Sequence, residues 1–280
     1  MTFPWSPIVN LYIGPLALYV EAIFSTLAFA VFIWWALKGL KRENIKISKE
    51  NLLLFFIIII LGGYFFGWLW YYIEYVVENV TFISPFGSGV TSYGMFFGGI
   101  FLTMFLAFWY NKKYKIEKSN MTFFGRITDA LVPAGAMFVF VYRMGCFLYG
   151  DVPGVATSVP WGILATYQTK FGELIRHPVA LYLSFSGLLI FIILHAFFSY
   201  KKTKKTKFGK RFHGETALWF VLLYSFNRFL IEFFAEGHNY EFVTRYFGLY
   251  SGQWALGIAF FGILACLIIG YARFNRSHKT

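Results

Sequence analysis

The sequence predicts an all-α, polytopic integral membrane protein with seven transmembrane helices. Of the 280 residues, 58% are hydrophobic, 23% are aromatic and only 14% are charged, whereas a soluble domain usually carries about 25% charged residues. Apolar runs recur along the whole chain and reach the roughly 20 residues that are needed to cross a bilayer. We therefore expect a single transmembrane domain, residues 1–280, without a separate soluble domain.

Seven apolar runs are the predicted spans. They cover about residues 12–37, 51–73, 94–110, 127–149, 178–199, 214–235 and 250–272. The third run is the shortest, and Gly94, Gly98 and Gly99 lie near its start. The N-terminal segment has no basic region followed by a small-residue cleavage site, so we expect it to be retained.

The basic residues lie in alternate loops, and this pattern predicts the orientation of the helices. The formal net charge is +12, and 20 of the 25 Lys and Arg residues follow the first, third, fifth and seventh spans. Because Lys and Arg are enriched in cytoplasmic loops, we expect the N-terminus outside and the C-terminus in the cytoplasm. The basic loops would then meet anionic membrane lipids. This placement argues against nucleic-acid binding, which requires a basic patch on one folded surface.

Two of the remaining basic residues lie inside predicted spans: Arg143 in the fourth and Arg228 in the sixth. A charge at membrane depth costs about 2.5–3.5 kcal/mol on insertion scales, and arginine keeps its charge in proteins. Each must face an anion, a wet cavity or an acidic side chain, which makes both residues candidates for function. Lys170, Arg176 and Arg245 are assigned to outer loops.

Small residues follow Arg143 near the end of the fourth span: Gly145, Cys146 and Gly150. Without side chains, the glycines would let a lipid headgroup approach the backbone closely. Glycines also allow helices to pack tightly, in which case Arg143 would pair with a nearby acid. The residues alone leave both interpretations open.

The sixth span carries Tyr224, Arg228 and Glu232 at intervals of four residues, which places them on one helix face. Arg228 and Glu232 would neutralise each other, although a paired guanidinium still has donors for a phosphate. In the first span, Glu21 would counter an arginine or, if buried, act as a base. His177 is interpreted as a hydrogen-bonding residue near the outer interface rather than as a catalyst.

Ligand motifs are sparse elsewhere in the sequence. No pattern of His, Cys and acidic residues predicts a metal site, and no Gly-Lys-Ser/Thr motif predicts a nucleotide site. The residues therefore indicate an anion pocket within reach of the outer leaflet, with a phospholipid headgroup as its ligand. An anion transporter and a purely structural ion-pair network are the alternatives.

Several motifs, in a shared order, resemble the prolipoprotein diacylglyceryl transferase family. Residues 143–150 read R-M-G-C-F-L-Y-G and resemble the family's R-x-G-C-F-L signature, and residues 224–234 resemble its Y-x-x-x-R-F-x-x-E-F-F element. Further similarities are Ile13-Gly14-Pro15, Gly98-Gly99, Asp129 through Pro133, Gly154, Pro160-Trp161-Gly162, His177-Pro178 with Leu181-Tyr182, and Gly252-Gln253. The resemblance covers nearly the whole chain.

The resemblance implies a reaction in the bacterial cytoplasmic (inner) membrane. The diacylglyceryl group of phosphatidylglycerol is transferred to the lipobox cysteine of a prolipoprotein signal peptide; a thioether forms and glycerol phosphate leaves. This is the first step of bacterial lipoprotein maturation, and it implies no metal and no organic cofactor. By the resemblance, Arg143 and Arg228 bind the phosphate, Tyr224 orients the headgroup, Glu232 holds Arg228 and Gly154 shapes the outer loop. Further substrate contacts are expected at Gly98, Gly99, Gly145, Cys146 and Gly150.

The chain departs from the family at several positions. Family members commonly have Tyr where this chain has Glu21, some have His at Phe97, and Gly usually precedes the arginine where Tyr142 stands. Glu often occupies the position of Leu183, and Arg that of Ala235. Since the histidine is absent, Glu21 is the expected substitute base. The departures leave open a transporter, a non-catalytic homologue, or a divergent paralogue with another lipid or acceptor.

Overall fold

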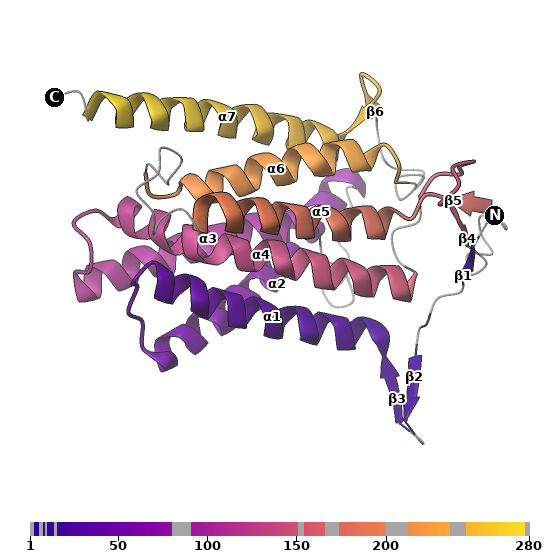
Figure 1. The fold of residues 1–280 in the computed structure, drawn as a ribbon, viewed down its shortest axis with the longest axis horizontal. Coiled ribbons are helices and arrows are strands. Elements are labelled where there is room, and N and C mark those ends of the chain that lie inside the picture. The colour runs from indigo at the N-terminus through magenta and orange to yellow at the C-terminus, as the bar shows by residue number, and fades with distance from the viewer. Residues whose placement is uncertain are drawn as a thin grey trace. The chain divides into compact units, whose positions relative to one another are not determined.

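The computed structural model describes residues 3–5, 8, 10–13, 16–79, 91–150, 154–165, 174–199, 212–235 and 245–277. Most of these residues are helical (Figure 1). The helices are α1 (Val20–Arg42), α2 (Lys49–Asn79), α3 (Ser92–Tyr114), α4 (Asn120–Tyr149), α5 (Val179–Ile193), the π-helix η1 (Leu194–Ser199), α6 (Glu215–Glu232) and α7 (Ser251–Ser277).

Within the described residues, six helices are long and apolar enough to cross a membrane: α1 to α4, α5 with the start of η1, and α7. These helices support the predicted multi-pass membrane protein. Helix α6, which corresponds to the predicted span 214–235, is not among these six helices. Its 18 residues include the charged residues Glu215, Arg228 and Glu232, and charges oppose insertion into a bilayer. The count of seven spans therefore stays a prediction.

The first predicted span, residues 12–37, is wrong at its N-terminal end. Strand β2 (Asn10–Ile13) pairs antiparallel with β3 (Leu16–Tyr19), and α1 begins only at Val20. In the sequence, Pro15 lies between the two strands, and proline cannot continue a helix because it lacks the N–H and its ring clashes with the preceding turn. The predicted span included hairpin residues because they are mostly apolar, like those of the helix.

The other strands are short and belong to the connections between helices. Strand β4 (Ile163–Ala165) pairs parallel with β1 (Phe3–Trp5) and antiparallel with β5 (Leu174–Arg176). A second hairpin, β6 (Arg245–Tyr246) with β7 (Leu249–Tyr250), precedes α7. These strands order parts of the loops, and the helices remain the framework of the fold.

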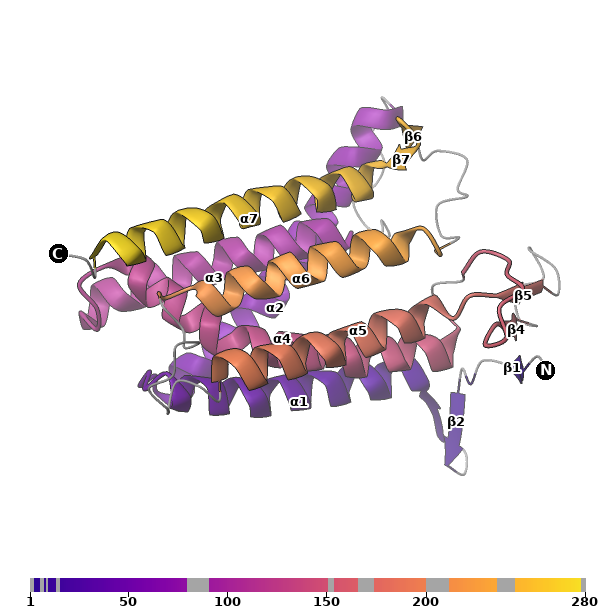
Figure 2. The same cartoon turned by 45° about the horizontal axis from the view of Figure 1, so that its top comes forward.

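The contacts of the chain gather in two compact units, Met1–Arg42 with Thr128–Thr280 and Glu43–Ile127. In the larger unit, α1, α5, α6, α7 and most of α4 extend along a common direction, with β1 and the end of α7 at opposite ends (Figures 1 and 2). In the smaller unit, α2 packs along α3. The single transmembrane domain stays a prediction.

Small residues bring α4 close to two neighbours in the larger unit. A Cβ at Gly39 of α1 would lie 2.0 Å from the carbonyl oxygen of Ala130, and a Cβ at Gly187 of α5 would lie 3.0 Å from that of Ala136. The hydroxyl of Ser184 donates to the carbonyl oxygen of Phe140 at 2.8 Å. Helix α4 is thus held between α1 and α5.

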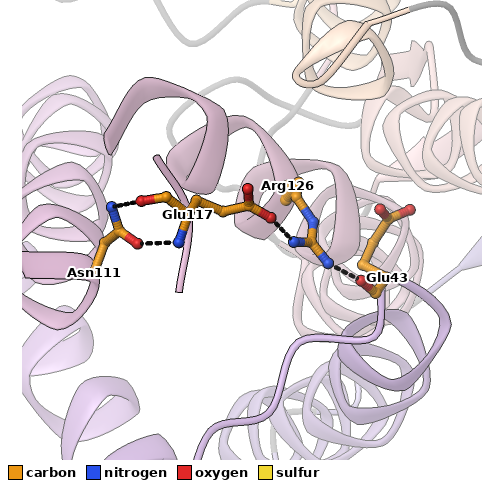
Figure 3. A network of polar contacts seen from close by, with 4 residues as sticks. All are labelled: Glu43, Asn111, Glu117 and Arg126. Carbon is orange, nitrogen blue, oxygen red and sulfur yellow. Dashed lines mark hydrogen bonds and ion pairs between the residues drawn. The ribbon is translucent and has the colours of Figure 1, made fainter. Parts of the chain in front are cut away.

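Arg126, in the smaller unit, uses both of its terminal nitrogens (Figure 3). Its guanidinium forms an ion pair with the Glu117 carboxylate and donates to the carbonyl oxygen of Glu43. The Asn111 side chain holds Glu117 in turn, accepting from its N–H at 2.8 Å and donating to its carbonyl oxygen at 3.1 Å. Because both terminal nitrogens of Arg126 are used, this network stabilises the turn between α3 and α4.

Candidate functional site

A buried carboxylate fixes the start of α6 to α4. Asp129 is 1% exposed, and its two oxygens accept the N–H of Gly214 at 2.7 Å and the N–H of Ala217 at 3.0 Å. The first N–H groups of a helix have no partner within the helix. A carboxylate that accepts two of them caps the helix and also complements its dipole.

The far ends of the same two helices are also joined. Beyond α4, the N–H of Val155 donates to the carbonyl oxygen of Phe234 at 2.9 Å, and Gly154 forms a β-bridge with Ala235. Since α4 and α6 are tied at corresponding ends, they run in the same direction between two fixed contacts.

These two contacts place Arg143 and Arg228 at one level. Arg143 follows Asp129 by 14 residues, and Arg228 follows Gly214 by 14 residues. At 1.5 Å per residue, each arginine lies about 21 Å along its helix from the shared contact. The spacing in the sequence does not reveal this, because it requires knowing that Asp129 touches the start of α6.

Contacts with α5 show which way Arg143 faces. Ala136 and Phe140 of α4 lie against Gly187 of α5. Arg143 follows Phe140 by three residues and Ala136 by seven, so all three share one face of α4. Arg143 therefore lies on the face of α4 that is turned toward α5.

Arg228 lies on the corresponding face of α6. Tyr224 packs against the buried cluster that contains Ile190 of α5, and Ile231 packs against Leu183 of α5. Arg228 lies four residues after Tyr224 and three before Ile231, on the same helix face. The two arginines thus project from α4 and α6 toward the same stretch of α5.

Arg143 has weak partners. Its Nη1 donates to the Cys146 sulfur at 3.8 Å, and its guanidinium lies 5.6 Å from the centroid of the Tyr142 ring. A thiol is a weak acceptor, and the described residues supply no carboxylate to this guanidinium. The expected alternative, an ion pair with a nearby acid, is not found within these ranges, and most donors of Arg143 stay available.

Arg228 has one strong partner and one open donor. Its Nη2 lies 2.9 Å from Oε2 of Glu232, which confirms the predicted pairing. Its Nη1 is buried and has no hydrogen-bond partner among the described residues. Leaving a buried donor unpaired costs about 1–3 kcal/mol, a cost that a phosphate oxygen would remove. Tyr224, one turn earlier, stacks on Phe220 at 5.8 Å.

Two glycines near Arg143 have structural explanations. A Cβ at Gly145 would lie 2.3 Å from the Cβ of Phe24 in α1, so this glycine permits close packing of α1 and α4. Gly150 has a φ of 90° and ends α4 with its N–H bonded to the Cys146 carbonyl at 3.0 Å, a conformation that favours glycine. Their expected contacts with substrate, and that of Cys146, stay predictions.

The predicted Gly98-Gly99 site lies in the smaller unit. A Cβ at Gly98 would lie 2.4 Å from the Cβ of Phe66 in α2, which makes it a packing position, whereas nothing approaches within 4 Å of a Cβ at Gly99. Phe97, at the position where some relatives have histidine, is exposed. Contact of either glycine with substrate stays a prediction.

Glu21 does not meet the condition of burial under which it was expected to act as a base. Its side chain is exposed in the first turn of α1, and no described residue forms an ion pair with it. The hairpin β2–β3 shifts the start of α1 to Val20, so Glu21 sits at a helix end instead of inside a span. It therefore lacks the environment that was expected to make it a base.

The sequence interpretation missed a buried arginine. Arg176, assigned to an outer loop, is 2% exposed, and its Nη1 donates to the carbonyl oxygen of Gly154 at 3.0 Å. Gly154 also packs closely against His177, because a Cβ at Gly154 would lie 2.1 Å from the His177 carbonyl oxygen. The sequence feature that could have indicated the burial of Arg176 is its position directly before the His177-Pro178 element.

Comparisons with known proteins agree on one family. The family model described as "Prolipoprotein diacylglyceryl transferase" matches residues 8–270. The chain is 30% identical to the phosphatidylglycerol–prolipoprotein diacylglyceryl transferase of Pseudoalteromonas atlantica, covering 96% of this chain and 88% of the relative. The enzyme of the same name from Campylobacter curvus is 32% identical over 88% of this chain and 84% of its own length. That from Wolbachia pipientis is 28% identical over 89% and 88%.

Proposed function

The chain belongs to the prolipoprotein diacylglyceryl transferase family, and on that premise we propose that Arg143 and Arg228 bind the phosphate of its lipid substrate. It is a transferase that moves the diacylglyceryl group of phosphatidylglycerol to a prolipoprotein. The acceptor is the thiol of the lipobox cysteine in the signal peptide. The site rests on the contact of Asp129 with the start of α6, which puts both arginines about 14 residues beyond a shared point, on helix faces turned toward α5. Among the described residues, Nη1 of Arg228 has no acceptor.

The reaction explains why two guanidiniums are needed. The thiolate sulfur forms a bond to the glyceryl carbon, and the bond from that carbon to the phosphate oxygen breaks. The electron pair stays with the oxygen, so a phosphodiester with one negative charge becomes glycerol phosphate with two. Fixed arginine donors that strengthen their hydrogen bonds as this charge develops lower the barrier.

The neighbouring residues have supporting roles. Glu232 fixes the orientation of Arg228 through the 2.9 Å ion pair, and Tyr224 orients the headgroup from the preceding turn. Gly154 shapes the loop beyond α4, where the Arg176 guanidinium holds its carbonyl. Gly145, Cys146 and Gly150 are further proposed substrate contacts on α4, and Gly98 and Gly99 are proposed substrate contacts within the smaller unit. Membrane lipids are the proposed surroundings.

The proposed setting is the bacterial inner membrane with seven spans. Helix α6 would cross as the sixth span because Arg228 is paired with Glu232 and Glu215 accepts a hydrogen bond from the Tyr271 hydroxyl, which reduces the cost of its charges. The alternate basic loops place the N-terminus outside and the C-terminus in the cytoplasm. Arg143 and Arg228 then lie in the outer half of the membrane.

The alternatives are less well supported. A transporter needs polar residues along the full depth of its route, whereas Arg143, Arg228, Glu232 and Arg176 gather toward the C-terminal ends of α4 and α6. A non-catalytic or divergent homologue that uses another lipid or acceptor would keep the fold without this reaction.

The test is release of glycerol phosphate by the purified protein from phosphatidylglycerol in the presence of a lipobox peptide. We expect product from the wild type and a loss of at least about 100-fold from Arg143→Lys and Arg228→Lys. Lysine keeps the charge but lacks the planar fork that binds two phosphate oxygens. The matched control is Arg126→Lys, in which an arginine engaged with Glu117 is changed and activity should persist. No product from the wild type, or full activity of both site variants, would contradict the proposal.

A further inference from the structure

A chain of hydrogen bonds lies beside the loop that follows α4. The indole Nε1 of Trp161 donates to the hydroxyl oxygen of Tyr182 at 2.8 Å, and that hydroxyl lies 3.0 Å from Nδ1 of His177. The indole N–H can only donate. The Tyr182 oxygen therefore accepts from Trp161, and its own hydrogen is free to point to His177.

This arrangement favours one tautomer of the imidazole. With Tyr182 donating to Nδ1, the neutral ring carries its proton on Nε2 and can accept a second one at Nδ1. The pKa of His177 is lowered by its burial, so the ring is neutral at pH 7. The described groups around it that titrate or carry charge are Tyr182 from α5 and Arg176 from β5. The ring of Phe234, just beyond the end of α6, lies 4.9 Å from the His177 ring.

The hydrogen bonds among Trp161, Tyr182 and His177 lie at the same end of the larger unit as the proposed phosphate site. Tyr182 packs on the cluster of Val179, Leu183, Ile231 and Ala235, and Ile231 follows Arg228 by one turn on the same face of α6. The N–H of His177 donates to the carbonyl oxygen of Val155 at 3.1 Å, within the loop that bridges α4 and α6. Among the described histidines, His195 lies beyond the opposite end of α5 and His213 directly before α6.

We propose that Tyr182 and His177 take the proton of the acceptor thiol, with Tyr182 as the group that contacts the sulfur. This inference rests on the proposed function. It replaces Glu21 as the expected base, since Glu21 is exposed and this pair is half-buried beside the bridged ends of α4 and α6.

The proton transfer balances as a relay. The thiol S–H proton passes to the Tyr182 oxygen as the Tyr182 proton passes to Nδ1 of His177. The thiolate then attacks the glyceryl carbon, and the carbon–oxygen bond to the phosphate breaks with its electron pair on glycerol phosphate. Imidazolium finally returns the proton, through Tyr182, to the departing phosphate or to water. No oxidant or further reactant is required.

The test compares kcat/KM from pH 5.5 to 9.5 for the wild type, His177→Gln and Tyr182→Phe, with phosphatidylglycerol and a lipobox peptide. Wild-type activity should fall with acidification, because a protonated ring cannot accept the thiol proton, and burial shifts this fall to a lower pH than an exposed histidine would show. Each variant should lose about 10²- to 10⁴-fold at pH 7. The deficit should shrink toward and above pH 8.5, where the thiol ionises unaided, and the double variant should be no worse than either single one.

Three comparisons decide the outcome. His195→Gln, the same substitution at a histidine outside the relay, should keep the wild-type profile. Binding of phosphatidylglycerol without peptide should be unchanged in His177→Gln, since the step before thiol attack needs no base. The relay would be overturned if His177→Gln lost the same factor of activity at every pH, or if it lost no activity. In both cases, product from the wild type would still support the transferase. An inactive wild type would instead overturn the proposed function.

Discussion

At the residue scale, Arg143 and Arg228 differ in how completely they are neutralised. Arg228 is paired at 2.9 Å with a Glu232 side chain that is 4% exposed, and removal of one partner of a buried pair costs about 3–5 kcal/mol. Among the described residues, the partners of Arg143 are a thiol and an aromatic ring. A phosphate anion would therefore neutralise more uncompensated charge at Arg143. At Arg228 it would supply an acceptor for Nη1, which has none among the described residues.

Gly154→Ala is expected to be disruptive because the new Cβ would lie 2.1 Å from the His177 carbonyl oxygen. Backbone on that side cannot yield cheaply, so we predict a loss of about 1–3 kcal/mol of stability. The thermal unfolding midpoint of the purified protein and its transferase activity should both fall.

The control for Gly154 is Gly135→Ala in α4, where no atom lies within 4 Å of the new Cβ. Alanine is favoured over glycine in a helix by up to about 1 kcal/mol, so this variant should match or exceed wild-type stability. Equal behaviour of the two alanine variants would show that Gly154 is not held against His177.

At the element scale, tertiary contacts at the two ends of α6 fix its position. Its start is capped by Asp129 of α4, and its end is bridged by Gly154 and Val155. These contacts set the height of Arg228 against that of Arg143. A shift of α6 by one turn would displace Arg228 by about 5.4 Å, which exceeds the reach of one phosphate shared by both guanidiniums.

Asp129→Ala should therefore lower both stability and activity. The loss of a helix cap costs about 0.5–2 kcal/mol, seen as a lower thermal unfolding midpoint, and Arg228 would lose its fixed height. Asp129→Asn keeps one acceptor oxygen and should be milder. If Asp129→Ala unfolded at the wild-type temperature and kept full activity, the cap would not be what positions α6.

At the scale of the whole molecule, the distribution of charge along the chain determines the predicted orientation. The basic loops alternate with acidic ones in the sequence, and in the larger unit β1 and the end of α7 lie at opposite ends (Figure 1). An odd number of spans accounts for both features. The most basic loop, residues 201–211, lies outside the described residues.

The orientation can be measured with C-terminal fusions in bacterial cells. Because Arg273, Arg276 and Lys279 follow the last span, we expect a C-terminal fluorescent protein to fluoresce and a C-terminal alkaline phosphatase to be inactive. Removal of α7 at residue 250 should reverse both signals. Active phosphatase on the full chain would exclude the proposed orientation.

The sequence by itself determined the membrane class, the approximate positions of the helices and the two arginines. A long apolar run indicates a membrane helix, and a charged residue inside such a run has a large free-energy cost of transfer into the bilayer. Both features can be identified from the residue types alone. It also predicted the Arg228–Glu232 pair, because partners four residues apart on one helix need no tertiary contact. It misplaced the start of α1, since composition does not distinguish a hairpin strand from a helix, and Glu21, near that start, is exposed.

Only the tertiary structure decided which distant residues lie close together around the proposed site. Asp129 meets Gly214 across 85 residues of sequence, and this contact, with the bridge from Gly154 to Ala235, brings Arg143 and Arg228 to one height. The burial of Arg176 and the bonds among Trp161, His177 and Tyr182 likewise depend on how the loop folds back. Such contacts follow from the packing of distant segments, and no periodicity in a single sequence records them.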